Sequence, residues 1–199
     1  YLELGAGDLL RPLGGTREDF RITGSVAAGF SAIGGTRVVD FAEKAEATTV
    51  YFDNADLTFS PGTFLLQNAN ASGVLILKNT FDLNGQNRDF QVDNLNFAAV
   101  VTGRITDSAS GPGLTKTGAG TLVLAGSSDL STGIKVDAGT LQVSNEGALG
   151  YAGLSLTGGS LAFRFDGRGA KPGFSDNGSG LPEVVAFSGG DIRLNGNHS

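Results

Sequence analysis

The chain of 199 residues contains no cysteine, methionine or tryptophan, and its one histidine, His198, is the second-last residue. Without cysteine there is no disulfide framework, no thiolate zinc site and no cysteine nucleophile. A histidine beside the end of the sequence is a poor general base because nothing fixes its orientation. A Ser-His-Asp triad and a histidine metal site are therefore both disfavoured.

Long apolar runs and an excess of basic residues are also missing. No segment approaches the roughly 20 apolar residues of a membrane helix. The net charge is -6 and the pI is about 4.7, which disfavours nucleic acid, since such a partner requires a basic face. We expect no membrane insertion and no nucleic-acid binding. Because the first residue is Tyr1, we expect a processed product or a piece of a longer protein.

Sustained helical periodicity is absent as well, and the best helical candidate, residues 39–47, is very short. Short runs rich in β-forming residues are frequent, and each is bounded by Gly, Asn, Asp, Ser or Pro. They lie at 20–23, 36–41, 48–52, 63–67, 73–78, 88–92, 98–105, 121–124, 140–143, 154–157, 160–165, 183–187 and 191–194. Many short strands separated by turns predict an all-β protein.

Glycine is abundant, with 32 residues, about twice its usual share of roughly 7%. A short phrase recurs with it, as AGTLVL (119–124), AGTLQV (138–143), GGSLAF (158–163) and GGDIRL (189–194), with weaker echoes at 60–66 and 71–77. The second glycines of these phrases are Gly120, Gly139, Gly159 and Gly190, so the first two intervals are nearly equal and the third is longer. The longest interval contains an expected loop insertion at 167–182.

A period of about 20 residues is typical of one rung of a parallel β-solenoid. The glycine permits a positive φ or a close backbone approach at a corner, and the alternation that follows points one set of side chains inward. This set is Leu122, Leu124, Leu141, Val143, Leu161 and Phe163, with Ile192 and Leu194 at the equivalent positions of the last rung. We therefore predict an all-β fold, a right-handed parallel β-helix of roughly ten rungs.

A β-sandwich or jelly roll built from hairpins is the alternative fold. The Asn-Gly pairs at 84–85 and 195–196 are the hairpin signals that favour it, but a sandwich gives no reason for the 20-residue period. For the solenoid, we expect one domain over residues 1–199. It has irregular rungs at 1–110, repeat-matching rungs at 111–166, the insertion at 167–182 and a last rung at 183–199.

Residues 111–150, GPGLTKTGAGTLVLAGSSDLSTGIKVDAGTLQVSNEGALG, closely resemble the autotransporter-associated β-strand repeat, also called the passenger-associated transport repeat. The residues that match its pattern are Gly113, Leu114, Thr115, Lys116, Gly118, Gly120, Thr121, Leu122, Leu124, Gly126, Val136, Ala138, Gly139, Thr140, Leu141, Val143, Ala148, Leu149 and Gly150. The turn at 127–134 departs from the family, which usually has an aromatic residue there. The resemblance implies a β-helical region of a long bacterial protein, in an extracellular or cell-surface location.

Few residues suggest chemistry. Asp53, Asn54 and Asp56 have the local spacing of oxygen ligands for calcium, but the iterated nonapeptide of calcium-binding β-helices is missing. The carboxylate pairs Glu18/Asp19 and Asp53/Asp56 leave a β-helix polysaccharide lyase or hydrolase open, although turn formation explains most such aspartates. We expect no catalytic residue and no cofactor.

The asparagine and phenylalanine residues are predicted to have structural roles. We expect turn or stacking roles for Asn84, Asn87, Asn94, Asn96, Asn145 and Asn195. We expect core positions for Phe59, Phe64, Phe90, Phe97 and Phe163, whereas Phe174 in the insertion is the candidate for an exposed contact.

The sequence thus favours a non-enzymatic extracellular structural or passenger module of a bacterial surface protein. Open strand edges at the ends of a solenoid pair with other copies, so self-association into filaments or layers is expected. The alternatives are a carbohydrate-binding adhesin, with polysaccharide as its partner, and the polysaccharide lyase or hydrolase.

Overall fold

Parallel β-strands build all of the regular structure that the computed structural model describes, and none of it is helical. The described residues are 1–13, 20–23, 27–41, 49–53, 59–109, 111, 113–164, 185–187 and 191–195. Their strands form two sheets of eight strands and a third sheet of three. Every pairing between these strands is parallel. The predicted all-β solenoid is confirmed, and the hairpin sandwich is wrong because hairpins pair antiparallel strands.

Each sheet collects one strand from successive passes of the chain. The first sheet contains, in order, β1 (Leu2–Leu4), β3 (Ala28–Ala32), β6 (Thr63–Leu66), β9 (Arg88–Val92), β12 (Gly113–Thr117), β14 (Gly133–Val136), β16 (Leu154–Leu156) and β18 (Val185–Phe187). The second contains β2 (Leu9–Leu10), β4 (Arg37–Asp40), β7 (Leu75–Leu77), β10 (Ala99–Val101), β13 (Thr121–Leu124), β15 (Thr140–Val143), β17 (Ser160–Arg164) and β19 (Asp191–Asn195). The third contains β5 (Thr49–Tyr51), β8 (Thr80–Asp82) and β11 (Ile105–Thr106).

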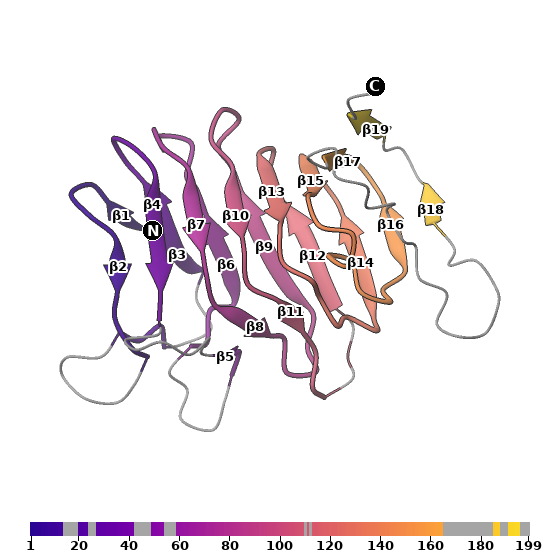
Figure 1. Ribbon diagram of the computed structural model, residues 1–199, viewed down its shortest axis with the longest axis horizontal. Helices are drawn as coiled ribbons and strands as arrows, with labels where there is room; N and C mark the ends of the chain where they lie inside the picture. Colours follow the sequence, from indigo (N-terminus) through magenta and orange to yellow (C-terminus); the bar gives the residue numbers. More distant parts are fainter. Residues whose placement is uncertain are drawn as a thin grey trace.

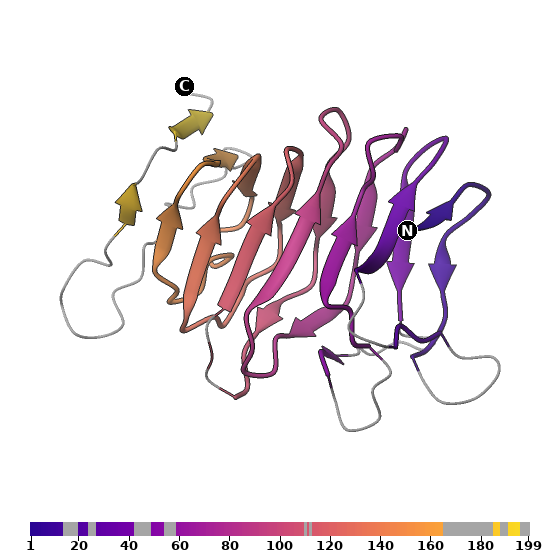
Figure 2. The same cartoon turned by 180° about the vertical axis from the view of Figure 1, so that it is seen from behind.

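One rung consists of a first-sheet strand and the second-sheet strand that follows it, and we number the rungs 1 to 8 from β1. The two sheets of eight strands therefore make eight rungs among the described residues, fewer than the ten predicted. The rungs follow one another along the long axis of the molecule, from the indigo N-terminal strands to the yellow C-terminal ones (Figures 1 and 2). Among the described residues, the third sheet closes rungs 2 to 4, and it lies beneath them in Figure 1.

Rung length changes along the molecule. Leu114 pairs with Ile134 and Ile134 pairs with Leu154, so the register of these rungs advances by the predicted 20-residue period. Phe64 pairs with Phe90, which is a longer interval. The period therefore describes residues 113–164, and the earlier rungs are longer because they also contain third-sheet strands and loops. The pairing of β17 with β19 lengthens the interval again, across the segment predicted as an insertion.

Some local predictions need correction. Val39 and Asp40, expected to begin a short helix, belong to β4, and residues 42–47 lie outside the described residues. The echo at 60–66 contains β6 of the first sheet, so it is not equivalent to the phrase at 119–124, which contains β13 of the second sheet. The echo at 71–77 contains β7 of the second sheet and is equivalent to that phrase. The sequence reading also missed β1, β2, β3, β8, β12 and β14.

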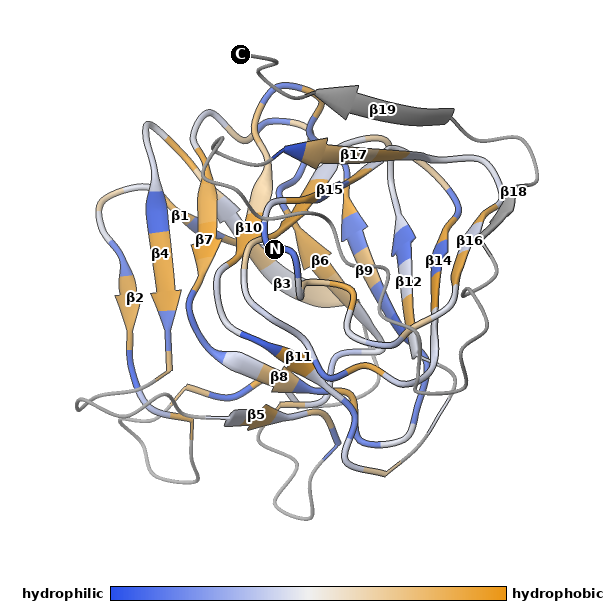
Figure 3. Ribbon diagram, turned by 45° about the vertical axis from the view of Figure 1, so that its right-hand side comes forward, coloured by the Kyte–Doolittle hydropathy of each residue, from blue (hydrophilic) through white to orange (hydrophobic). Residues whose placement is uncertain are grey.

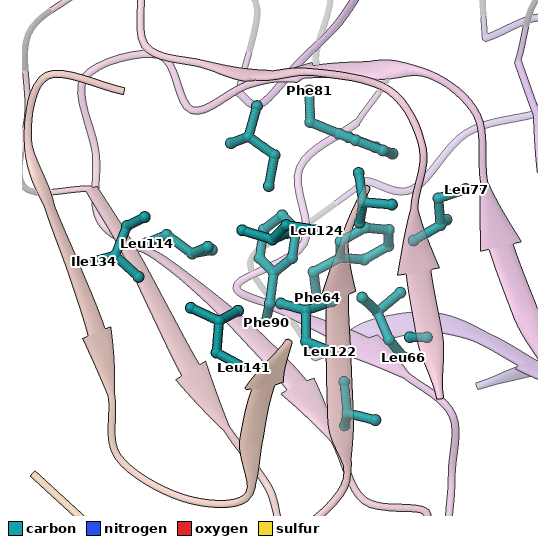
Figure 4. Close-up of a cluster of buried hydrophobic side chains, with 14 of the residues drawn as sticks. Phe64, Leu66, Leu77, Phe81, Phe90, Leu114, Leu122, Leu124, Ile134 and Leu141 are labelled. Carbon is teal, nitrogen blue, oxygen red and sulfur yellow. The ribbon is translucent and has the colours of Figure 1, made fainter. Parts of the chain in front are cut away.

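The interior is filled by buried side chains from the sheets, and its composition changes along the axis. Figure 3 shows the hydrophobic positions along the strands that supply them. Phe30, Phe41, Phe52, Phe59, Phe64, Phe81 and Phe90 are buried at rungs 2 to 4 and form a continuous set of ring contacts. From β12 onward the described core consists mainly of leucine, isoleucine and valine, with Phe163 in β17 as the exception. Figure 4 shows Phe90 beside Leu114, Leu122, Ile134 and Leu141 at this change. Phe97 is only partly buried, unlike the core position expected for it.

Candidate functional site

The repeat phrases stack in register in the second sheet. Leu122 pairs with Leu141, Leu141 with Leu161, and Leu161 with Ile192. Two positions further on, Leu124, Val143, Phe163 and Leu194 form a parallel column. Leu122, Leu141 and Leu161 are completely buried. The side chains of Ile192 and Leu194 lie outside what the structure describes, so only their backbone register is known.

The glycines of the phrase lie where the chain turns from the first sheet to the second. Gly139 has φ +68°, and a Cβ atom there would lie 2.3 Å from the carbonyl oxygen of Gly120. A Cβ on Gly120 would lie 2.2 Å from the carbonyl oxygen of Asn94 in the preceding rung. Because successive corners approach so closely, a side chain larger than hydrogen has no room at these positions. Gly159 is similarly enclosed, and Gly190 lies outside the described residues.

Lys116 is the most unusual residue of the repeat, because its long cationic side chain is completely buried. It stands in the first-sheet column between Phe90 and Val136, both core residues. Its Nζ donates hydrogen bonds to the carbonyl oxygens of Thr117 at 2.6 Å, Gly118 at 2.8 Å and Ala138 at 3.2 Å. Burial lowers the pKa of the Lys116 ammonium to about 8, and the negative charge of Asp93 opposes this shift in part.

These contacts give Lys116 a capping function. The corner at 117–120 and the corner at 138–139 direct part-buried backbone carbonyl groups toward the Lys116 ammonium, and a carbonyl shielded from water without a donor is costly. A single ammonium has three donors, so one lysine satisfies both corners and joins rung 5 to rung 6. From the sequence, Lys116 was identified only as a residue that matches the repeat pattern. Its position two places after Leu114 on an alternating strand was the available signal that it points inward.

Two amides occupy the same corner in the preceding rungs. The Nδ2 of buried Asn94 donates to the carbonyl oxygens of Asn68, Ala69 and Ala71, and its Oδ1 accepts from the backbone N–H groups of Asn96 and Phe97. Buried Gln67 donates to the carbonyl oxygens of Gly73 and Ala98 and accepts from the N–H of Ala32. Gln67, Asn94 and Lys116 are called the corner polar groups below.

The other asparagines of the prediction make local contacts. Asn84 has φ +52° and donates to the carbonyl oxygens of Phe52 and Asp53 in the preceding rung. Asn87 bonds to Thr115 in the next rung, and the side chain of Asn145 accepts from the N–H of Gly147 within its turn. These are turn contacts and contacts between rungs. They do not form a ladder of stacked asparagines.

Asp53, the first residue of the calcium candidate, is engaged in an ion pair with Arg88 at 2.6 Å. Its carboxylate also accepts a hydrogen bond from Ser60. Burial raises the pKa of Asp53, but the hydrogen bonds from Ser60 and Arg88 and the charge of Arg88 outweigh this effect and hold the pKa below its usual range. The guanidinium of Arg88 also lies 5.0 Å from the centre of the Phe52 ring, which is cation–π distance.

The remaining candidates for chemistry lie largely outside the described residues. Asn54, Asp56, Glu18, Asp19, Phe174 and His198 are all among the residues that the structure does not describe. Within the described ranges, no cluster of three or more His, Cys, Asp or Glu side chains could hold a metal ion. No helix in that part of the chain is long and apolar enough to cross a membrane.

Fold and site together define a parallel β-solenoid protein whose central rungs carry a recurrent glycine-leucine phrase. Residues 114–143 match the passenger-associated-transport-repeat family, as the resemblance over 111–150 indicated. The match spans β12 to β15 and includes Lys116 and both stacked phrases. Such a repeat implies a bacterial surface or secreted protein. Searches of curated proteins and of solved structures found no match.

The turn that departs from the family pattern is filled by a leucine. Leu130 is completely buried, and its carbonyl oxygen accepts a hydrogen bond from the N–H of Tyr151 in the following rung. Asp129 donates its N–H to the carbonyl oxygen of Ile105, in the third sheet of the preceding rung. The turn therefore continues the wall made by the third sheet, and Leu130 supplies the apolar contact there.

Proposed function

We propose that this chain is a non-enzymatic extracellular structural module of a bacterial surface protein, part of a passenger region that forms a rod. One observation carries the proposal: the matched repeat is built from backbone corners, an aliphatic column and a buried lysine that hold successive rungs together. Other charged side chains among the described residues also stabilise the fold. Asp107 accepts from the N–H groups of Gly85 and Gly111, and Asp53 and Arg88 neutralise each other.

An assay on polysaccharides tests the non-enzymatic part of the proposal. The purified chain is incubated with neutral and acidic polysaccharides, and the release of reducing ends and of unsaturated uronates is followed. We expect no turnover above a buffer control. Turnover that is abolished by Asp53→Asn or by Asp56→Asn would contradict the proposal and favour a lyase or hydrolase.

Self-association through strand edges is the second part of the proposal. Among the described strands, β1 and β18 end the first sheet, and β2 and β19 end the second, so each has a neighbour on one side only. Unpaired strand edges are templates for pairing with another chain, and head-to-tail pairing produces filaments. Light scattering over a hundredfold range of concentration should show a rising average mass, and a monomer throughout would remove this part of the proposal.

A carbohydrate-binding adhesin is a second candidate, favoured by the placement of tyrosine. All three tyrosines are exposed: Tyr1 by 42%, Tyr51 by 45% and Tyr151 by 51%. Tyr51 lies in the third sheet, and Tyr151 bonds to the wall that continues it. Exposed aromatic rings stack on sugars. Glycan-array binding that is lost in the Tyr51→Ala/Tyr151→Ala variant but kept in Tyr1→Ala would support the adhesin, whereas equal binding by both would exclude this face.

A further inference from the structure

The solenoid is built in two different ways on either side of the junction between rungs 4 and 5. Rungs 2 to 4 have a third sheet, a phenylalanine core and longer register intervals. Rungs 5 to 7, residues 113–164, have two sheets, a core that is aliphatic except for Phe163, and the short period of the repeat phrase. After Phe90, the next buried phenylalanine is Phe163. Figure 1 shows β11, the last strand of the third sheet, at this junction.

The corner polar groups face away from the junction. Asn94, in rung 4, donates back to the corner of rung 3 at residues 68–71. Lys116, in rung 5, donates to its own corner and forward to Ala138 in rung 6. Each group therefore joins rungs of its own half, and neither donates across the junction.

Contacts across the junction are of another kind. The backbone ladders between β9 and β12 and between β10 and β13 are both continuous, and the N–H of Gly120 donates to the carbonyl oxygen of Val92. The side-chain contacts that cross are Asn87 with Thr115, Arg104 with Asp129, and Ser128 with the N–H of Ile105. In the Arg104–Asp129 pair, both side chains are about half exposed. Exposed ion pairs contribute little to the free energy of unfolding.

We propose that the solenoid is a two-part device, in which the described parts of 27–109 and residues 113–164 open as separate cooperative units and Lys116 closes the second unit. Loss of the Lys116 donors removes the hydrogen bonds that the part-buried carbonyl groups of Thr117, Gly118 and Ala138 accept, and all three groups belong to that unit. The first unit retains its phenylalanine core and the contacts of Gln67 and Asn94. The C-terminal unit therefore detaches from the N-terminal one between β9 and β12 in the first sheet and between β10 and β13 in the second, while the N-terminal unit stays folded.

Amide hydrogen exchange, read by peptide, tests the proposal with the variant Lys116→Met. Methionine keeps the length and the apolar stem but removes all three donors. We expect exchange in 133–143 and 154–164 to rise about 10- to 100-fold, because the carbonyl groups bonded to Lys116 lose their donors. Exchange in 63–101 should be unchanged. Lys135→Met is the matched control, because Lys135 lies on the next first-sheet strand with its side chain half exposed and paired with Asp137. It should leave both regions unchanged.

The reciprocal variant is Asn94→Ala, with Asn96→Ala as its control because Asn96 is exposed in the same turn. Exchange should rise in 63–101 and remain near its original value in 133–143. An equal rise in both regions for either Lys116→Met or Asn94→Ala would show a single cooperative unit and overturn the proposal. Unchanged exchange in Lys116→Met would overturn the role of Lys116.

The unmodified chain gives an independent readout in case Lys116→Met does not fold. Exchange measured at increasing denaturant separates cooperative units by their different dependence on denaturant. We expect the amides of 63–101 and of 133–164 to converge on two distinct curves. One common curve for both regions would contradict the proposal.

Discussion

At the level of single residues, Lys116 shows how a charged side chain becomes part of a solenoid core. The residue completes an apolar column with its aliphatic stem, and its ammonium satisfies carbonyl groups that the glycine corners direct inward. An aliphatic residue would fill the column but leave these carbonyls without donors. Arginine has five donors in a rigid planar fork, which fits three converging carbonyls less well than a rotatable ammonium does.

The ionisation of Lys116 gives a testable pH dependence. Its pKa falls from the ordinary value of 10.5 to about 8 through burial. Between these values the unfolded chain holds more protons than the folded chain, so the contribution of Lys116 to the free energy of unfolding rises with pH over this window. Denaturant titrations at pH 7.5 and pH 10 should show this increase in the wild type and a smaller one in Lys116→Met. Equal pH dependence in both would contradict the assignment, and NMR of the lysine side chain would report the pKa directly.

Glycine at a corner provides a second test at this level. A Cβ on Gly73 would lie 1.8 Å from the carbonyl oxygen of Gly35, whereas a Cβ on Gly153 meets nothing within 4 Å. Gly73→Ala should therefore lower the free energy of unfolding by about 1–3 kcal/mol, the range for overpacking. Gly153→Ala should change it by less than about 0.5 kcal/mol. Similar losses for the two variants in urea titrations would mean that the corners are not packed as described.

At the level of strands, register follows from the recurrent phrase. Inward leucines and outward residues alternate along β13 and β15, so a shift of one position would turn Leu122 and Leu141 toward solvent. Parallel pairing brings equivalent residues of successive phrases together, so similar side chains stack on one another and form the columns. The hydrophobic stack and the glycine corners thus select the same alignment.

A cavity in this column should be costly, and the neighbouring outward position offers the control. Leu141→Ala removes a completely buried side chain between Leu122 and Leu161 and should lower the free energy of unfolding by about 2–5 kcal/mol. Gln142→Ala, at the adjacent half-buried position, should cost less than about 1 kcal/mol. Comparable losses for the two variants would show that Leu141 does not face the core.

The sequence predicted some of these elements better than others. β9, β13 and β15 were found with their boundaries because alternation and flanking turn residues agree there. β12 and β14 were missed, since Lys116 and Lys135 make their sequences read as polar although one lysine is buried and the other exposed. β8 was missed because it is very short and ends in Asp82, a buried turn former. Alternation within one rung does not reveal what a polar side chain meets in the next.

At the level of the whole molecule, the cross-section changes with the side chains available to fill it. Three walls enclose a wide interior at rungs 2 to 4, and phenylalanine fills it. Two sheets and a leucine-lined turn enclose a narrower one from β12 onward, where aliphatic side chains and Phe163 fill it. The 20-residue period seen in the sequence belongs to the narrow part. The wide part has no fixed period, so the period of the repeat phrase does not give the number of rungs along the whole chain.

The corner polar groups were equally hard to foresee. Gln67, Asn94 and Lys116 share neither a residue type nor a fixed spacing, and they are brought together only when the rungs stack. Asn94 was expected to have a turn or stacking role, and the structure shows how it joins two turns. The ion pair of Asp53 and Arg88 connects residues that are distant in the sequence, and nothing in the local sequence indicates it.

Methyl NOEs in a selectively labelled sample test the central claim, the stacking of successive phrases into one column, most directly. Neighbouring rungs are about 4.8 Å apart, so NOEs are expected between the methyl groups of Leu122 and Leu141, and between those of Leu141 and Leu161. The pair Leu122 and Leu161, two rungs apart, should give a much weaker signal or none. Absence of both neighbouring NOEs in the folded protein would contradict the solenoid and the function built upon it.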